Sequence, residues 1–506
     1  MVFGLELAAL GGDGCILHVG CISSSWPKPC LKGDYNGLGE SAAVPALRDF
    51  ILPPPPSRAK VPPEEIQGTF NYWRNRLLWS TYFGYAIFYV MRKNLAAALP
   101  AIQADLGVSR TAFGAFFTLH DIMYGLSKFL AGILADRLNP RFLISMGMLF
   151  AAVANLFFGF SNLVWVLGAA WVVNGFFQGF GFPPCARILS YWFAPSERGV
   201  KWGIFNTSHQ VGAFSALFLS GWLCVHYGWR SAFIVPAAIG AVTAVFLLVM
   251  VRDTPASLGL PAVEVFKGDV ELASDHYDDA GPIGSITSPA AIGAVAREKA
   301  DLNAFISKMV FRNPQIWLIC VANFFVYVVR SSFLNWAPTY LHEVKGLPLD
   351  EAGFISGFYE LAGLFGCLLG GWVTDRFLGQ RRAPACVGYM ILCAVFILLF
   401  WQTPHGHPLL DTLWLSGVGF SVYGPQFLVG VMMADLATKK AAGTAVGLSG
   451  LFGYMSGFFS GFGLSWVQTQ WGWGWAFGML MGSALVAVIP FAICWNSKPI
   501  LEETDL

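Results

Sequence analysis

Two arginines stand in the middle of long apolar stretches of this sequence. Arg92 follows Tyr89-Val90-Met91, and Arg330 follows Tyr327-Val328-Val329 at an offset of 238 residues. A charged side chain in hydrocarbon costs at least ~2.5–3.5 kcal/mol, so such residues usually face a cavity. A guanidinium is a fork that can bind two oxygens at once. Two forks facing one cavity would suit a doubly charged, tetrahedral oxyanion.

Other polar side chains in these apolar stretches could complete such a site. Lys128 and His209 could add hydrogen-bond donors, and tyrosines lie about one helical turn before the basic residues. These tyrosines are Tyr89, Tyr124 and Tyr327, and Tyr85 lies on the same predicted span as Tyr89. Lys93 adjoins Arg92 but points about 100° away on a helix, so we do not expect it to be a ligand.

Structural roles are the alternative for each of these residues. The two arginines could form ion pairs with Asp121 and Glu360, and Lys128 could pair with a carboxylate or extend to the interface. His209 and the tyrosines could simply pack in the interior. The symmetric placement of the arginines favours a shared central site over separate ion pairs.

The composition requires that lipid surround most of the chain. Of 506 residues 56% are hydrophobic and only 12% are charged, whereas soluble domains carry about 25% charged residues. Apolar stretches long enough to cross a bilayer recur from residue 77 onward. The sequence therefore predicts an all-α membrane protein with twelve spans, near 77–101, 113–135, 142–161, 163–190, 203–226, 230–251, 315–340, 352–374, 384–401, 411–434, 442–468 and 473–495.

Basic residues in the short loops predict the orientation. Loops after even-numbered spans carry nine lysines and arginines, and loops after odd-numbered spans carry three. Both termini should therefore be cytoplasmic. The predicted parts are a disordered tail (1–70), a six-helix bundle (71–251), a linker (252–313), a second six-helix bundle (314–496) and a short C-terminal tail (497–506).

An internal repeat relates the two predicted bundles. Arg92 and Arg330 share their offset of 238 with Pro100 and Pro338, and Asp136 and Asp375 are 239 residues apart. A near-constant offset indicates two pseudo-symmetric six-helix halves with a substrate site between them.

The repeated loop string resembles a motif of the major facilitator superfamily. Gly132-Ile-Leu-Ala-Asp136-Arg137, followed by Arg141, recurs as Gly371-Trp-Val-Thr-Asp375-Arg376, followed by Arg381 and Arg382. An aspartate at a helix end near arginines could hold the halves together when that side closes. The predicted gating residues are Asp136, Arg137, Arg141, Asp375 and Arg376; topology signalling by the arginines is the alternative.

More specific strings resemble the organophosphate:phosphate antiporter family, over residues 70 to 495. They are Arg92-Lys93-Asn94, Tyr124-Gly-Leu-Ser-Lys128-Phe, Gln178-Gly-Phe-Gly-Phe-Pro-Pro-Cys185, Arg252-Asp-Thr-Pro255, Asn335-Trp-Ala-Pro-Thr-Tyr-Leu341, Tyr423-Gly-Pro425 and Lys439-Lys-Ala-Ala-Gly-Thr-Ala445. The family signature, R-G-x5-W-N-x2-H-N-[LIV]-G-G, begins here at Arg198. Asn206 and His209 match it, whereas Phe205, Gln210 and Ala213 depart from it, which weakens inference about the exact substrate.

The resemblance implies roles for particular residues. Arg92 and Arg330 match the family's paired phosphate-binding arginines, and Lys128 and His209 match the nearby lysine and histidine. Glu360 matches a carboxylate on span 8. Cavity-lining positions match Tyr85, Tyr89, Tyr124, Asn206, Tyr327, Tyr423 and Tyr454. The lead Leu52-Pro-Pro-Pro-Pro56 and Tyr72-Trp-Arg74 look more like the hexose-phosphate sensor and transporter branch.

We therefore expect a monomeric antiporter that exchanges a phosphorylated sugar, with hexose-6-phosphate favoured, for inorganic phosphate. Glycerol-3-phosphate and phosphoglycerate are alternative substrates. A non-transporting receptor that signals to a sensor kinase, and a proton-coupled carrier using Asp121, Glu360 or His209, are alternative functions. The plasma (inner) membrane is the expected location and the plastid envelope the alternative. No cofactor, metal, nucleic acid or enzymatic activity is expected, since the sequence has no zinc-finger spacing, P-loop, nucleophile elbow or H-E-x-x-H pattern.

Overall fold

Helices with long apolar runs make up almost all of the described chain. The computed structural model describes residues 51–55, 57, 60–267, 307–379 and 381–497. The predicted tail 1–50, most of the predicted linker and the last nine residues lie outside this part, as do the side chains of Asp136, Arg198, Lys439 and Lys440. The described residues fall within one unit, Leu47–Leu506.

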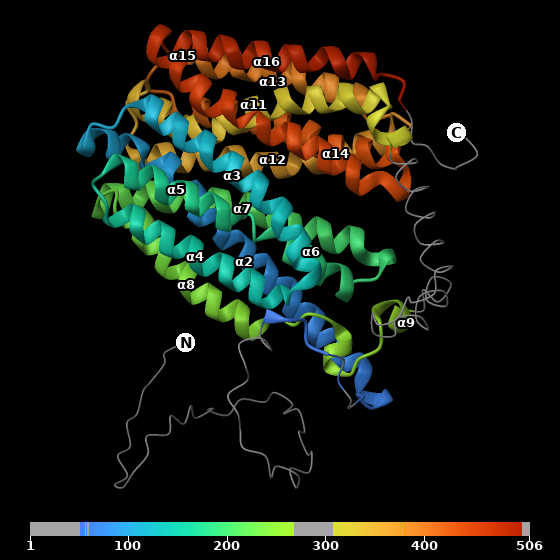
Figure 1. Cartoon of the computed structure of the whole chain (residues 1–506). Helices are drawn as coiled ribbons and strands as arrows, with labels where there is room; N and C mark the ends of the chain where they lie inside the picture. The colour runs from blue at the N-terminus through green and yellow to red at the C-terminus, as the bar shows by residue number, and fades with distance from the viewer. Residues whose placement is uncertain (1–50, 56, 58–59, 268–306, 380, 498–506) are drawn as a thin grey trace, which may run out of the picture. The chain divides into compact units, whose positions relative to one another are not determined.

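The first six spans form one group of helices, called here the first bundle and coloured blue to green in Figure 1. Within it α2 packs on α7 and α8, and α4 packs on α5 and α8. Its helices are α2 (Pro63–Leu106), α3 (Arg110–Arg137), α4 (Pro140–Phe160), α5 (Val164–Gln178), α6 (Phe182–Trp192), α7 (Pro195–Tyr227) and α8 (Ser231–Met250).

The last six spans form the second bundle, coloured yellow to red in Figure 1. Short elements precede it: η1 (Pro255–Leu258), α9 (Val263–Lys267) and the π-helical turn η3 (Ser307–Phe311). The bundle itself consists of α11 (Pro314–Glu343), α12 (Leu349–Arg376), α13 (Ala383–Gln402), α14 (Pro408–Met455), the π-helical turn η4 (Phe459–Gly463), α15 (Leu464–Trp471) and α16 (Trp473–Ile493). The predicted linker 252–313 falls between α8 and α11, and the predicted domain boundaries stay predictions.

Local sequence signals explain where several helices begin. Ser109 and Asn139 cap α3 and α4, because their side chains accept hydrogen bonds from the first free backbone amides. Asn313 does the same for α11, and proline follows it at the first helical position. These three helices begin one to three residues before the predicted starts of the spans at 113, 142 and 315.

The helix α2 begins at Pro63, inside the region 1–70 that the sequence analysis assigned to a disordered tail. Its first turns are amphipathic, and Phe70 is fully buried against Phe266 of α9 and Trp192 of α6. This apolar contact, which the sequence does not reveal, stabilises the extension.

The chain reverses direction within α14, although the helix assignment is continuous. Early in α14, Gly419 and then Leu428 contact successive positions of α12, so this part runs parallel to α12. Late in α14, Ser449 and then Gly453 contact successive positions of α11, so this part runs parallel to α11. Because the consecutive helices α11 and α12 run in opposite directions, α14 must turn back. It therefore supplies the predicted spans 411–434 and, with η4 and α15, 442–468.

Eight described helical segments are long and apolar enough by composition to cross a membrane. The spans that miss this measure are α2, α3, α7 and the late part of α14 with η4 and α15. Each of these four contains predicted site residues, whose charge or polarity lowers the mean hydropathy. Predicted site residues also lie on spans that meet the measure, such as Arg330 on α11 and Glu360 on α12.

The two bundles contact each other at one end, which we call the Arg110 side. Arg110 at the start of α3 forms an ion pair with Glu343 at the end of α11. The Thr118 hydroxyl donates to the carbonyl of Gly457 at 3.0 Å. The opposite end, called the terminal side, is where α2 begins and α16 ends.

Glycine allows α7 and α12 to approach closely on the Arg110 side. A Cβ added at Gly353 would lie 2.4 Å from the carbonyl oxygen of Leu217. This clash is with a backbone atom, which cannot move aside as the end of a flexible side chain could. Small residues at helix interfaces permit this approach in membrane proteins, where packing stabilises helix association.

We expect the substitution Gly353→Leu to separate the bundles on the Arg110 side, because overpacking costs about 1–3 kcal/mol. The measurement is the yield of bis-maleimide cross-linking between cysteines placed by Arg110→Cys and Glu343→Cys, which should fall several-fold. Gly482→Leu is the matched control, since no atom lies within 4 Å of a Cβ there. An unchanged yield in the Gly353→Leu protein would show that the close approach is unimportant.

Candidate functional site

A cavity with an empty volume of about 320 Å³ lies where α2, α3, α11 and late α14 meet; we call it the charged cavity. Both arginines identified from their spacing line it. The full lining is Tyr89, Arg92, Lys93, Asp121, Tyr327, Arg330, Ser331, Gly453 and Tyr454. Residues 238 positions apart therefore line one cavity between the two bundles.

Aromatic rings and a carboxylate surround the guanidinium of Arg92. Its central carbon lies 3.7 Å from the centre of the Tyr124 ring and 5.5 Å from that of Tyr89. Its nearest carboxylate oxygen, on Asp121, is 3.7 Å away, which is long for a hydrogen bond. The Nε atom of Arg92 is buried without a hydrogen-bond partner. Arg92 is thus held by cation–π contacts and retains donors for another group.

Arg330 has an equivalent environment in the second bundle. Its guanidinium carbon lies 5.0 Å from the ring centre of Tyr423 and 5.4 Å from that of Tyr327. The hydroxyl of Tyr359 donates to its backbone carbonyl at 3.2 Å, which fixes this point of α11. Its Nε atom is also without a partner.

Glu360 lies in the protein interior and is not part of the cavity lining. It is fully buried, and the Tyr423 hydroxyl donates to one of its oxygens at 2.5 Å. No ion pair joins it to Arg330 among the described residues. Of the two ion pairs in the structural alternative, Arg92–Asp121 and Arg330–Glu360, only the first occurs among the described residues, at 3.7 Å.

Lys128 and His209 approach the cavity from its edges. The ammonium of Lys128 lies 3.5 Å from the hydroxyl of Tyr454 and 4.7 Å from the ring centre of Phe182. The His209 ring lies 5.7 Å from Tyr89 and 6.4 Å from Tyr423. It is thus between tyrosines that flank the two arginines.

A close approach of α7 to α2 positions His209. A Cβ added at Gly212 would lie 2.4 Å from the carbonyl oxygen of Ala86 and 2.8 Å from Cβ of Tyr89. Glycine one turn after His209 therefore lets the imidazole reach Tyr89.

The remaining predicted side chains differ in their placement. Tyr85 is buried behind the lining, with its ring 5.5 Å from Tyr89 and 5.3 Å from Phe205. The ring of Tyr124 packs 5.1 Å from Tyr454, which joins the bundles across the cavity. Asn206 is exposed and is not part of the cavity lining.

Lys93 lines the charged cavity, so the prediction that it points away from the site was wrong. Its ammonium donates to the amide oxygen of Asn335 across the bundle interface at 3.3 Å. The helix α2 contacts both α11 and α12 of the second bundle, so Arg92 and Lys93 both reach the cavity although neighbouring residues are about 100° apart on a helix. Ser331 was also missed, and its position beside Arg330 is the only sequence signal for it.

The predicted gating residues lie on the terminal side, where their described contacts stay within one bundle. Arg382, rather than the exposed Arg376, forms an ion pair with Asp375 and lies 3.7 Å from Asp435. Arg141 donates to the carbonyl of Leu248, and Arg137 is exposed. The side chain of Asp136 is outside the described part. A latch between the bundles on this side stays a prediction.

Arg187 of α6 is a further basic residue on the terminal side that the sequence analysis did not identify. It donates to the carbonyl of Ala135 and lies 3.4 Å from the carboxylate of Asp253, just after α8. Burial raises the pKa of Asp253 above its ordinary value, and the Arg187 guanidinium opposes that shift. The pair ties three helices of the first bundle together.

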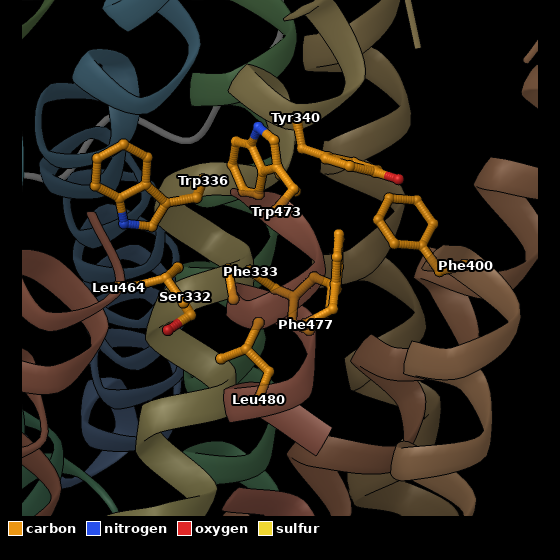
Figure 2. Close-up of a pocket in the computed structure, with 11 residues that line it drawn as sticks. Ser332, Phe333, Trp336, Tyr340, Phe400, Leu464, Trp473, Phe477 and Leu480 are labelled. Atoms are coloured by element: carbon orange, nitrogen blue, oxygen red, sulfur yellow. The ribbon is translucent and has the colours of Figure 1, made fainter. Parts of the chain in front are cut away.

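A second cavity lies inside the second bundle and is almost entirely apolar. Figure 2 shows aromatic side chains around it, from Trp336 and Tyr340 of α11, Phe400 of α13, and Trp473 and Phe477 of α16. It contains none of the predicted site residues. An anion would find no charge there, so the charged cavity is the candidate site.

Relatives of this chain are transport and sensor proteins. A probable hexose phosphate transport protein of Chlamydia muridarum is 36% identical over 438 residues, covering 86% of this chain and 94% of the relative. A glycerol-3-phosphate transporter of Bacillus subtilis is 35% identical over 455 residues, covering 88% and 98%. Membrane sensor protein UhpC of Escherichia coli is 33% identical over 430 residues, covering 84% and 94%.

The fold also matches a solved structure. A bacterial homolog to the human lysosomal transporter Spinster, in an inward-facing and unoccupied conformation, aligns with a TM-score of 0.62 and 17% identity, covering 84% of this chain and 95% of that one. Residues 81–461 match the family described as Major Facilitator Superfamily. The chain therefore belongs to the major facilitator superfamily and, within it, to the organophosphate:phosphate antiporter family.

Proposed function

We propose that this protein exchanges a phosphorylated sugar, preferably a hexose-6-phosphate, for inorganic phosphate across a membrane. The observation that carries the proposal is the meeting of Arg92 and Arg330 in one cavity between the bundles. Each guanidinium keeps an unpartnered Nε atom, and neither can lose its proton at physiological pH. A phosphate dianion offers oxygens to both guanidinium forks. Inorganic phosphate and its monoesters both carry such a group.

The tyrosines around the arginines support a sugar-bearing ligand. Tyr89, Tyr327 and Tyr454 line the cavity and present hydroxyl groups that can donate to or accept from a sugar. Their rings also hold the guanidiniums, so the same residues would orient the forks and contact the substrate. The hexose phosphate relative supports this substrate class.

Exchange follows from the charge of the unloaded site. A dianion that contacts an arginine from each bundle draws the bundles together, which lowers the cost of passing through an occluded state. Without it, two guanidiniums repel each other across the cavity, and reorientation is slow. A ligand drives this change only by binding the occluded form more tightly than the open forms. The bundles then rock about the site.

The contacts between bundles favour an inward-facing arrangement. The basic loops support a cytoplasmic location for the terminal side, and the Arg110–Glu343 pair would then close the opposite side. The described ion pairs of the terminal side, such as Arg382–Asp375, do not cross between the bundles. Access to the charged cavity from the cytoplasm would require the contacts of Tyr124 and Lys128 with Tyr454 to open.

A receptor for a sugar phosphate is the second candidate. The similarity to a membrane sensor protein over 84% of this chain favours it. A receptor would keep the same binding cavity and lack exchange. Transport and binding must therefore be measured separately.

The first test is exchange in proteoliposomes loaded with radiolabelled inorganic phosphate. External glucose-6-phosphate should release the label, buffer should not, and glycerol-3-phosphate should release it more slowly. The matched control is protein-free liposomes with the same load. Label that stays trapped with every organophosphate, although one of them binds, would support the receptor instead.

The second test replaces each cavity arginine by lysine. Arg92→Lys and Arg330→Lys should each lower the exchange rate about hundredfold, because losing one partner of a buried, hydrogen-bonded charge pair costs about 3 kcal/mol, and an ammonium cannot reproduce the fork. Arg312→Lys, at an exposed position between η3 and α11, is the matched control. Near-normal exchange in both cavity variants would contradict the two-fork site.

A further inference from the structure

Asp121 is a carboxylate in the wall of the charged cavity, where an anion is proposed to bind. It lies on α3 and lines the cavity together with Arg92 and Arg330, and its side chain is 13% exposed. A negative group in an anion site opposes binding of the anion, so its presence there calls for an explanation. The phosphate-binding proposal does not account for it.

Three neighbours hold this carboxylate at the cavity wall. The His120 ring, buried and stacked 5.1 Å from Trp171, places Nδ1 3.3 Å from an Asp121 oxygen. Gly457 of the other bundle packs so closely against Asp121 that a Cβ added to this glycine would lie 3.0 Å from the Cβ of Asp121. Arg92 lies on the remaining side. Asp121 therefore has no room to withdraw from the cavity.

Arg92 is not tightly paired with this carboxylate. The separation of 3.7 Å is at the long end for an ion pair, and Arg92 keeps an unpartnered Nε atom. Asp121 thus presents negative potential to the cavity as well as to Arg92. A purely structural partner would make a shorter, bidentate contact.

The charges around the cavity match a dianion. Among the described residues, Arg92, Lys93 and Arg330 line it, and Lys128 reaches its wall through Tyr454. Asp121 lines it, and Glu360 lies behind Arg330 through Tyr423. Four cations and two carboxylates leave a formal charge of +2. The two negative charges of a phosphate monoester with an uncharged remainder balance this value. A ligand with an additional carboxylate carries more negative charge than the cavity balances.

We propose that Asp121 is a specificity-determining residue that favours organophosphates with an uncharged remainder over phosphorylated carboxylic acids. Because Asp121 lines the same cavity as both arginines, the carboxylate of such an acid would lie close to that of Asp121. Like charges at short range in a low-dielectric site repel strongly, and discrimination often rests on such a repulsive element. The inference rests on the proposed function, because it assumes that phosphate binds in this cavity.

The test uses two ligands that differ at one carbon. Glycerol-3-phosphate carries a hydroxymethyl group where 3-phosphoglycerate carries a carboxylate. Each competes with radiolabelled inorganic phosphate for binding to the purified full chain in lipid nanodiscs. Wild-type protein should prefer glycerol-3-phosphate, and Asp121→Asn should shift the ratio of the two competition constants toward 3-phosphoglycerate about tenfold. Asp121→Glu, which keeps the charge, should retain the wild-type preference.

Asp105→Asn is the matched control, because Asp105 is an exposed carboxylate at the end of α2 that pairs with Arg230 away from the cavity. Its ratio should equal that of the wild type. An Asp121→Asn ratio equal to wild type, or loss of all phosphate binding by a variant with wild-type thermal unfolding, would overturn the inference and leave Asp121 a structural partner of Arg92. Absence of phosphate binding by the wild type would instead overturn the proposed function, and the inference with it.

Discussion

The burial of two guanidinium groups at the interface of two helical bundles is the constraint on which this structure depends. Arg92 and Arg330 carry charges that cannot be neutralised by deprotonation, in a protein that is otherwise mostly apolar. Burying such charges is costly unless partners compensate for it. Here aromatic faces supply most of the compensation: Tyr124 and Tyr89 for one arginine, and Tyr423 and Tyr327 for the other. Rings stabilise a cation without occupying its donors.

This compensation explains why the two halves are similar but not equivalent. Each half has an arginine, a tyrosine one turn before it and a carboxylate on the following helix. In the first half Asp121 reaches the cavity and approaches Arg92, whereas in the second half Glu360 is buried and bound by Tyr423. The repeat therefore sets the architecture, and individual substitutions set the charge presented to a ligand. Asymmetry of this kind is what a site needs to recognise a substrate with two different ends.

Much of this was available from the sequence. Charged residues inside apolar runs identified Arg92, Arg330 and Lys128, and the constant offset placed the two arginines in corresponding helices. Hydropathy located the spans, because a bilayer permits only long apolar helices or closed barrels to cross it. Ser109 and Asn139, which cap the helices that follow them, are further local signals that the prediction of the spans did not use. All of these signals are local or periodic, which is why a single sequence contains them.

Contacts across the bundle interface were decided only by the tertiary structure. Whether Lys93 faces the cavity depends on how wide an arc of α2 meets the second bundle, and helical periodicity does not specify this. The same holds for Arg382 as the partner of Asp375, for Asn206 lying off the cavity, and for the reversal within α14. The Lys93–Asn335 contact joins residues 242 positions apart through packing of whole helices, whereas Asp375 and Arg382 are close in sequence and meet because of how the chain turns after α12. The sequence by itself determined which residues needed a polar partner, and only the packing of the two bundles decided which partner each one found.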